Sequence, residues 1–407
     1  MRRRWHGQRD DHREDLTLID LYAKRELFED EHESFRESTR SFLERNVVAH
    51  IEDWDAEEDV PRDVWTSAGG QELLGLSTAE ELGGGGVNDY RFRVAFIEEA
   101  ARVGATSVAA GFSAHTDIVI PYIEDLATPE QAKRWVPGMV DGTKIGAIAM
   151  TEPGTGSDLR EIRATARRVD DGWVLNGSKT FIPNGIHADL VIVVARTETA
   201  AEGGSNAFSL FVVEDGTPGF TRGRRLKKIG MKAQDTAELS FEDVHLPADA
   251  LLGEEGKGLH ALMSHLPLER LSIAVTACAG TRAALAWTIS YIKERKAFGK
   301  ELAEFQNTQF VIAELVTELE VTQSYIDDAV LRLNAGTLTA VDAAKAKWWA
   351  TEMHKRAVDR CVQLFGGYGY MLEYPIARAY ADTRVTTIYG GTTEIMKTIV
   401  ARDVLGD

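Results

Sequence analysis

Cysteine is scarce in this sequence, and no spacing of cysteine or histidine indicates a disulfide framework or a metal site. The 407 residues include two cysteines, Cys278 and Cys361, which lie far apart on apolar helical stripes. Isolated cysteines on apolar faces are typical of buried free thiols in a reducing compartment. We therefore expect a cytoplasmic protein without a bound metal.

Long hydrophobic runs are also missing, because no apolar stretch approaches the roughly 20 residues that a membrane-spanning helix needs. The longest run, Leu190 to Ala195, is bounded by Asp189 and Arg196 and predicts a buried strand. The opening stretch, MRRRWHGQRDD, has no apolar region for a secretory signal and is too short and too acidic for a mitochondrial presequence. We expect residues 1–24 to be a disordered lead-in and the chain to have no integral membrane segment.

The sequence has fewer basic than acidic residues. Lys and Arg number 46 against 64 Asp and Glu, which gives a formal net charge of −18. Nucleic acid is not expected as a partner, because proteins that bind it usually present a basic face. An acidic surface suits a basic docking patch on a protein partner, whereas a polyanionic small ligand requires a local cluster of Arg and Lys.

Three common catalytic fingerprints are absent. No GxGxxG follows a predicted strand, and the sequence contains neither GxSxG nor HExxH. Nicotinamide-dependent enzymes, serine hydrolases and zinc proteases therefore lose the motif on which each would depend.

Helical and strand patterns divide the chain into three parts. We expect a helical domain over 25–144, a β-domain over 145–258 and a helical domain over 259–407. Thr339 with Asp342 resembles a capping box between two long helices of the last domain. Four amphipathic helices in succession predict a bundle, and bundles this apolar often oligomerise. The strand-like apolar segments of the middle part are 145–150, 173–175, 190–195, 208–213 and 237–241.

Six segments combine glycine, hydroxyl and aromatic residues in a way that indicates a cofactor site. Glycines let a backbone approach a ring or phosphate closely, and hydroxyls and free N–H groups donate to its acceptors; each segment taken alone could also be a turn or a core feature. Arg295 could bind a pyrophosphate or be solvated at a helix end. Glycine pairs in helices cost about 1 kcal/mol per residue, which indicates a ligand or a tight helix crossing. The segments are AMTEPGTGSD (149–158), GSKTFIPNG (177–185), KIGMKAQDTAEL and its continuation (228–258), ERKAFGKELAEFQ (294–306), QLFGGYGYMLEYP (363–375) and IYGGTTEI (388–395).

In this order and at these intervals, the six segments resemble the acyl-CoA dehydrogenase family. TEPGTGSD, RKAFGK, FGGYGY and IYGGTTEI are jointly specific, and the resemblance extends from about residue 28 to residue 405. LPLERL, MKAQDTAEL and LEYPIARAY most resemble the long-chain members. The resemblance implies an α+β fold with an N-terminal helical domain, a middle β-domain and a C-terminal four-helix bundle. It also implies bound FAD, an acyl-CoA substrate, electron transfer to electron-transfer flavoprotein, and a homotetramer.

The resemblance assigns cofactor and substrate contacts motif by motif. The flavin and the start of the thioester site would be lined by Ile148, Met150, Thr151, Gly156 and Ser157. The isoalloxazine ring would lie against Phe181, Ile182 and Pro183. The FAD pyrophosphate of a neighbouring subunit would contact Arg295, Phe298, Phe305 and Gln306. The adenosine and phosphate pocket would be completed by Gln363, Leu364, Gly366, Gly367, Thr392 and Glu394. The substrate would contact Ser157, Leu268, Glu269, Arg270, Tyr389 and Gly391.

The catalytic base departs from the commonest family pattern. Many members carry a Glu directly after the Ile-Tyr pair, where this sequence has Gly390. The long-chain and isovaleryl branches carry the base on a helix instead, in a motif that matches Leu268 to Arg270. The resemblance therefore makes Glu269 the base and leaves Gly390 as a backbone N–H donor to the enolate. On the residues alone, Glu269 could be an acidic residue of a first helical turn after Pro267.

Pro183 is a second departure, because many relatives have Thr or Ser there, near flavin N5, and proline supplies neither a hydroxyl nor an N–H. The expected reaction is α,β-dehydrogenation of a long, straight fatty acyl-CoA to the trans-2-enoyl-CoA, with Glu269 taking the α-proton and FAD N5 the β-hydride. Pro183 keeps open an acyl-CoA oxidase or a flavin monooxygenase on the same scaffold. Branched-chain or steroid acyl-CoA substrates also stay open, and so does a non-catalytic acyl-CoA-binding protein.

Overall fold

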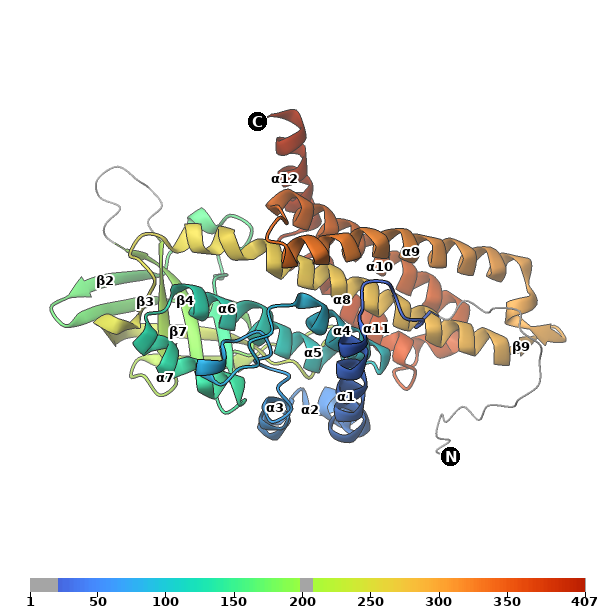
Figure 1. The fold of residues 1–407 in the computed structure, drawn as a ribbon, viewed down its shortest axis with the longest axis horizontal. Helices are drawn as coiled ribbons and strands as arrows, with labels where there is room; N and C mark the ends of the chain where they lie inside the picture. The colour runs from blue at the N-terminus through green and yellow to red at the C-terminus, as the bar shows by residue number, and fades with distance from the viewer. Residues whose placement is uncertain (1–20, 198–207, 407) are drawn as a thin grey trace.

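A computed structural model describes residues 21–197 and 208–406. Along the chain, a helical part is followed by a β-sheet and then by a second helical part, and the sheet lies at one end of the molecule (Figure 1). The N-terminal part is helical, and a π-helical turn at Ala114–Val119 joins α5 to α6. Thr128 begins α7 with the capping box that its hydroxyl and Gln131 form. The helices of this part are α1 (Asp30–Asn46), α2 (Ile51–Glu57), α3 (Arg62–Gly69), α4 (Tyr90–Arg102), α5 (Thr106–Ser113), α6 (Ile120–Leu126) and α7 (Pro129–Val140).

The predicted disordered lead-in of residues 1–24 reaches into the described part of the chain at residues 21–24. Residues 1–20 lie outside the described part of the chain. Leu21, however, is buried in the helical core, and its carbonyl oxygen accepts a hydrogen bond from the Arg282 guanidinium. The prediction of disorder is therefore wrong for residues 21–24.

The middle part is one mixed β-sheet, with strand order β6-β7-β3-β2-β4-β5-β8 and with β1 paired in parallel to β4. The apolar run at Leu190–Ala195 is the centre of β4, and all six of its residues are buried, as predicted. Such complete burial fits a strand with neighbours on both edges and covered faces. The strands are β1 (Gly146–Ala149), β2 (Thr165–Val169), β3 (Gly172–Pro183), β4 (Leu190–Thr197), β5 (Phe208–Glu214), β6 (Phe220–Arg225), β7 (Thr236–Pro247) and β8 (Leu251–Leu252).

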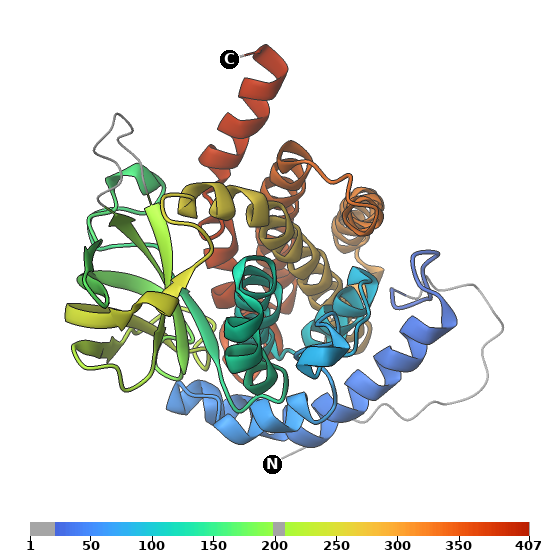
Figure 2. The same cartoon turned by 60° about the vertical axis from the view of Figure 1, so that its left-hand side comes forward.

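The C-terminal part is built on three long helices that pack together, while α12 projects from the body (Figure 2). Thr339 and Asp342 form the predicted capping box, with Asp342 N donating to Thr339 Oγ1 at 3.1 Å. A small β-hairpin, β9 (Lys296–Ala297) with β10 (Lys300–Glu301), follows α8. The helices are α8 (Gly258–Glu294), α9 (Gln306–Asn334), α10 (Ala340–Phe365), α11 (Pro375–Thr383) and α12 (Thr393–Leu405).

Helix α8 runs through the whole molecule and joins two hydrophobic cores. One core lies among the helices and the other inside the β-domain, and α8 contributes residues to both. In the described part of the chain, α8 is the one helix long and apolar enough to cross a membrane by length and composition. Its most apolar window is 61% buried inside the protein, as in the core helix of a globular fold.

Candidate active site

Glu269 lies well inside α8, not at a helix start. The helix begins at Gly258 and continues through Pro267, so the interpretation as a first-turn acidic residue is wrong. Glu269 is 5% exposed, and its Oε1 accepts a hydrogen bond from the Tyr122 hydroxyl at 3.1 Å. Burial raises the pKa of Glu269, while the Tyr122 hydrogen bond and the positive charges of His265 and Arg270 oppose that rise. A buried carboxyl with a raised pKa is suited to proton transfer near neutral pH.

Ile273 links the Gly390 loop to the helix that carries Glu269. Ile273 is four residues after Glu269 and therefore shares its face of α8. A Cβ built on Gly390 would lie 2.4 Å from Ile273 Cδ1, and Gly390 has a φ of +64°. Any side chain at residue 390 would therefore need a strained backbone and would enter space that Ile273 occupies. The loop backbone therefore approaches the helix face that carries Glu269.

Two buried cations lie beside this loop. Arg270 is 6% exposed, its Nε has no hydrogen-bond partner, and burial lowers its pKa. Lys347 is fully buried, and its Nζ donates to the carbonyl oxygen of Gly391 at 2.7 Å. Burial and repulsion from Arg270 lower the pKa of Lys347 to about 8. Neither cation has a carboxylate within ion-pair distance among residues 21–197 and 208–406, which leaves positive potential near Gly390.

The TEPGTGSD and GSKTF segments lie against one another. Glu152 accepts hydrogen bonds from the backbone N–H groups of Arg163 at 2.7 Å and Ala164 at 2.9 Å. It also pairs with Lys179 at 2.9 Å, and Lys179 donates to the Met150 carbonyl at 3.0 Å. Both side chains are buried. This ion pair fixes the turn that carries the predicted flavin contacts to strand β3.

The predicted flavin contacts differ in how far their side chains are exposed. Thr151 is half-buried, and Gly156 and Ser157 are exposed on the turn. Ile148 and Ile182 are buried in the β-core, so each offers its backbone and not its side chain. Exposed backbone and hydroxyl groups on this turn fit a ligand with many acceptors.

Phe181 is the apolar group presented beside that turn. It is 67% exposed, with a left-handed φ of +58°. A bulky residue in this conformation is a local cost of about 1 to 2 kcal/mol. Such outliers persist at ligand sites, which is where the sequence placed Phe181. Pro183 follows at the end of β3, where it pairs with Thr236 of β7.

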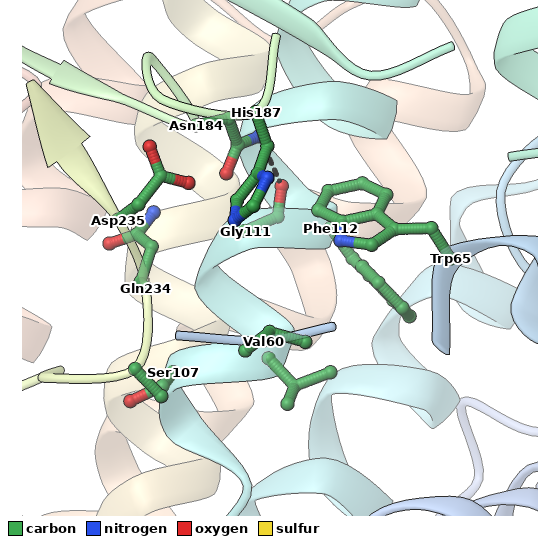
Figure 3. Close-up of a pocket in the computed structure, with 11 residues that line it drawn as sticks. Val60, Trp65, Ser107, Gly111, Phe112, Asn184, His187, Gln234 and Asp235 are labelled. Carbon is green, nitrogen blue, oxygen red and sulfur yellow. Dashed lines mark hydrogen bonds between the residues drawn. The ribbon is translucent and has the colours of Figure 1, made fainter. Parts of the chain in front are cut away.

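A cavity beside the end of β3 contains none of the predicted site residues (Figure 3). Asn184, next to Pro183, is buried with a φ of +59°. Its Nδ2 donates to the carbonyl oxygen of Gly111 at 2.9 Å and to that of Gly146 at 3.3 Å. These hydrogen bonds tie the end of β3 to α5 and β1.

The remaining cofactor residues form a second cluster at the far end of α8. Arg295 follows α8, and its guanidinium lies 5.6 Å from the Tyr368 ring centroid. Arg295 is 26 residues after Glu269, which at 1.5 Å per residue places the two roughly 39 Å apart. One chain therefore does not bring this cluster to Glu269. Its members are Arg295, Phe298, Phe305, Gln306, Gln363, Leu364, Gly366 and Gly367.

The glycine pair of this second cluster faces open space. Gly366 has a φ of +62°, and a Cβ built on Gly366 or Gly367 meets no atom of the described chain within 4 Å. A tight helix crossing within the chain is therefore not the reason for these glycines. Phe298, whose ring lies 6.4 Å from that of Phe305, is 97% exposed. The residues fit a ligand or a second subunit that approaches from outside.

Thr392 and Glu394 lie at the start of α12, directly after the Gly391 loop. The Thr392 hydroxyl accepts a hydrogen bond from Ile395 N at 3.3 Å and caps the helix. Glu394 is exposed in the first turn, and Tyr389 precedes the two glycines. The IYGGTTEI segment thus links the base region to an exposed helix start.

Two residues at this site were missed from the sequence. Tyr122 carried no motif signal. Lys347, however, falls on the buried stripe of α10 formed with Ala343, Ala350 and His354. A lysine on an apolar helix face is a signal that could have been used.

Comparison with known proteins gives the class that this fold and site define. Models of the N-terminal, middle and C-terminal domains of acyl-CoA dehydrogenase match residues 29–143, 147–244 and 256–405. The chain is 49% identical over 390 residues to the mouse (Mus musculus) mitochondrial long-chain specific acyl-CoA dehydrogenase, covering 96% of this chain and 90% of that protein. It is 35% identical to the mitochondrial isovaleryl-CoA dehydrogenase of rice (Oryza sativa subsp. japonica), covering 93% of this chain and 92% of the other.

Solved structures agree. An acyl-CoA dehydrogenase from Geobacillus kaustophilus superposes with a TM-score of 0.91 at 45% identity, covering 94% of this chain and 100% of that one. A glutaryl-CoA dehydrogenase from Mycobacterium smegmatis in complex with FADH2 superposes with a TM-score of 0.89 at 26% identity, covering 96% and 98%. The chain belongs to the acyl-CoA dehydrogenase family. It is an oxidoreductase that depends on FAD, and its predicted fold is confirmed.

Proposed function

We propose that this acyl-CoA dehydrogenase oxidises long, straight fatty acyl-CoA substrates of β-oxidation, with Glu269 as the base. The observation that carries the proposal is the meeting of α8 with the Gly390 loop. Ile273 fills the space of a side chain at residue 390, and the buried Glu269 carboxyl lies one turn away on the same helix face. The similarity to long-chain specific relatives supports the chain length.

The chemistry requires a base and an oxyanion donor. The α-proton of a thioester is far too weakly acidic for a carboxylate in water, so donors must stabilise the enolate that develops. The backbone N–H of Gly390 would point at the thioester oxygen, and the buried charges of Arg270 and Lys347 would favour negative charge nearby. Glu269 would take the α-proton. Bound FAD supplies the acceptor, at N5, for the hydride that leaves the β-carbon.

The experiment follows the visible flavin band after palmitoyl-CoA is added without oxygen. Rapid bleaching is expected for the wild type, and a loss of at least a thousandfold in rate for Glu269→Gln, on the order of removing an essential base. Glu124→Gln is the matched control, because burial also raises the pKa of Glu124 but its side chain faces Thr78 and Ala79. A chain-length series that peaks at butyryl-CoA contradicts the long-chain assignment, and a peak at branched or steroid esters would redirect it.

We infer that electron-transfer flavoprotein is the electron acceptor. A solved structure described as an electron transferring flavoprotein of Acidaminococcus fermentans is 32% identical to this chain, with a TM-score of 0.89, and the net charge of −18 suits a basic docking patch. Pro183 favours the second candidate, an acyl-CoA oxidase or monooxygenase, because it offers N5 no donor. We expect the reduced flavin of the enzyme to be reoxidised slowly by oxygen and rapidly by electron-transfer flavoprotein. Rapid peroxide release would favour the oxidase.

We further infer a homotetramer in which a second copy completes each cofactor site. The roughly 39 Å between Glu269 and Arg295 and the exposed apolar residues near Arg295 support it. Phe298 is 97% exposed, Tyr370 85% and Leu372 58%. Mixed oligomers of Glu269→Gln and Arg295→Ala subunits are expected to regain activity that neither variant has alone. A monomeric mass by light scattering for fully active enzyme would contradict the assembly.

We also propose a cytoplasmic location. Cys278 and Cys361 are both buried and free, which fits a reducing compartment. The mouse and rice relatives are named as mitochondrial, so fractionation of the source cells is the deciding measurement. Recovery with the soluble cytoplasmic enzymes is expected, and recovery in an organelle would overturn the proposal.

A further inference from the structure

Tyr122 is a fully buried tyrosine that does not belong to any of the six motifs. It lies on α6, and its hydroxyl donates to Oε1 of Glu269 on α8 at 3.1 Å. Burial and the nearby carboxylate both raise the pKa of Tyr122, so the phenol stays protonated and acts as the donor. The hydrogen bond uses Oε1, and no hydrogen bond to Oε2 is formed by residues 21–197 or 208–406.

The Tyr122 ring is held in place by His265. The two rings stack with centroids 4.0 Å apart and an interplanar angle of 20°. His265 lies one helical turn before Glu269 on α8, and it is fixed in turn at both nitrogens. Its Nε2 contacts Asp125 Oδ2 at 2.9 Å, and its Nδ1 lies 2.9 Å from the Ala261 carbonyl oxygen. The position of the Tyr122 hydroxyl is thus set by packing and not by the carboxylate alone.

Few charged or titratable groups face Glu269. Tyr122 comes from α6, and His265 and Arg270 come from α8 itself. Asp125 of α6 lies behind His265, and its side chain is 68% exposed. Tyr122 is the one direct hydrogen-bond donor to the Glu269 carboxylate among the described residues. Without the Tyr122 hydrogen bond, burial would raise the pKa of Glu269 further, because less would stabilise its carboxylate form.

We propose that Tyr122 is the positioning residue of the base: its hydroxyl holds Oε1 of Glu269, directs Oε2 at the substrate α-carbon and keeps the carboxyl ionised. The inference deepens the proposed function and rests on Glu269 as the base. In the reaction, the α C–H bond breaks and an Oε2–H bond forms. The Tyr122 hydroxyl remains a donor to Oε1 before and after this transfer, since a protonated carboxyl still has an acceptor oxygen.

The test is the pH dependence of kcat/KM with palmitoyl-CoA for Tyr122→Phe, which removes one oxygen and keeps the stacked ring. A hydrogen bond to a charged group has a value that corresponds to about one to two pKa units. Its loss destabilises the anionic carboxylate and raises the pKa of Glu269. The acid limb of the profile should therefore move up by about one to two units. Activity should fall roughly tenfold to a hundredfold below the limb and recover at alkaline pH.

The control is Tyr325→Phe on α9, which removes a hydroxyl that donates to the carbonyl oxygen of Asp342 on α10 at 3.4 Å. Its profile should match the wild type. A uniform loss for Tyr122→Phe at every pH would indicate a structural role and overturn the inference, as would an unmoved limb. If Tyr122→Phe does not fold, a ring-fluorinated tyrosine at residue 122 keeps the stacked ring and makes its hydroxyl a stronger donor to Glu269, so the acid limb must move down; no shift overturns the inference.

Failure of this inference is separable from failure of the proposed function. If Glu269→Gln stays active, the base assignment fails whatever Tyr122→Phe does. If Glu269→Gln is inactive and Tyr122→Phe keeps the wild-type profile, only the role of Tyr122 fails. The Glu269→Asp variant allows a double-mutant cycle. The shorter side chain moves the carboxylate away from Tyr122, so adding Tyr122→Phe to Glu269→Asp should change the pH profile much less than Tyr122→Phe changes that of the wild type.

Discussion

Gly390→Ala tests why the loop carries no side chain at the position where many relatives carry their base. The substitution adds one carbon at a residue whose φ is +64°. That carbon would lie 2.4 Å from Ile273 Cδ1, while the next atom, Ile273 Cγ1, is 3.9 Å away. The obstacle is thus a single atom at the end of a movable side chain, added to an unfavourable backbone conformation.

The expected cost has two parts. A left-handed conformation costs an alanine about 1 to 2 kcal/mol relative to glycine. Moving Ile273 off its preferred rotamer costs about 0.5 to 1.5 kcal/mol. If the whole sum displaces the Gly390 N–H from the thioester oxygen, the barrier rises by about 1.5 to 3.5 kcal/mol, and the rate falls roughly tenfold to a few hundredfold.

The assay is anaerobic flavin bleaching by palmitoyl-CoA in a stopped-flow instrument. Ile273→Val removes the obstructing Cδ1, so Gly390→Ala with Ile273→Val should recover the rotamer part, roughly twofold to tenfold. Ile273→Val alone is the control for changes in packing on α8. A Gly390→Ala enzyme as fast as the wild type refutes the argument, and so does a double variant no faster than Gly390→Ala.

Two further predictions concern buried groups near the site. Lys179→Met leaves Glu152 buried without its cation and should destabilise the turn that carries the predicted flavin contacts by about 3 to 5 kcal/mol. The measurement is the melting temperature followed by flavin fluorescence, which should be lower than in the wild type. Adding Glu152→Gln should recover part of the loss, and an unchanged melting temperature contradicts the pairing argument. Burial lowers the pKa of His115 to about 4, so the unfolded chain takes up a proton as the pH falls below about 6.5 while the folded chain does not. Stability should therefore fall between about pH 6.5 and 4, and His115→Gln should flatten that fall in pH-dependent urea melts; an unchanged slope would refute it.

The sequence alone located the longer apolar strands, and it missed two strands whose residues are mostly polar as well as the two-residue β8. The run Leu190–Ala195 became β4 because a fully buried strand must be apolar on both faces. Strands β2 (TARRV) and β6 (FTRGRR) were missed, since each has one buried residue and the rest are partly or fully exposed. Their strand character comes from pairing with β3 and β7, and such pairing cannot be read from a local pattern.

The motifs determined the family, the cofactor and the identity of the candidate base. Glycines and hydroxyls at fixed spacing carry that information locally, because the backbone itself must approach the ligand. Tertiary structure alone decided how the base is surrounded. Tyr122 reaches Glu269 across 147 residues of chain, and Lys347 reaches the Gly391 carbonyl across 44. Ile273 closes the space at Gly390. Such contacts depend on how helices pack, and packing is fixed by the whole core and not by the residues that meet in it.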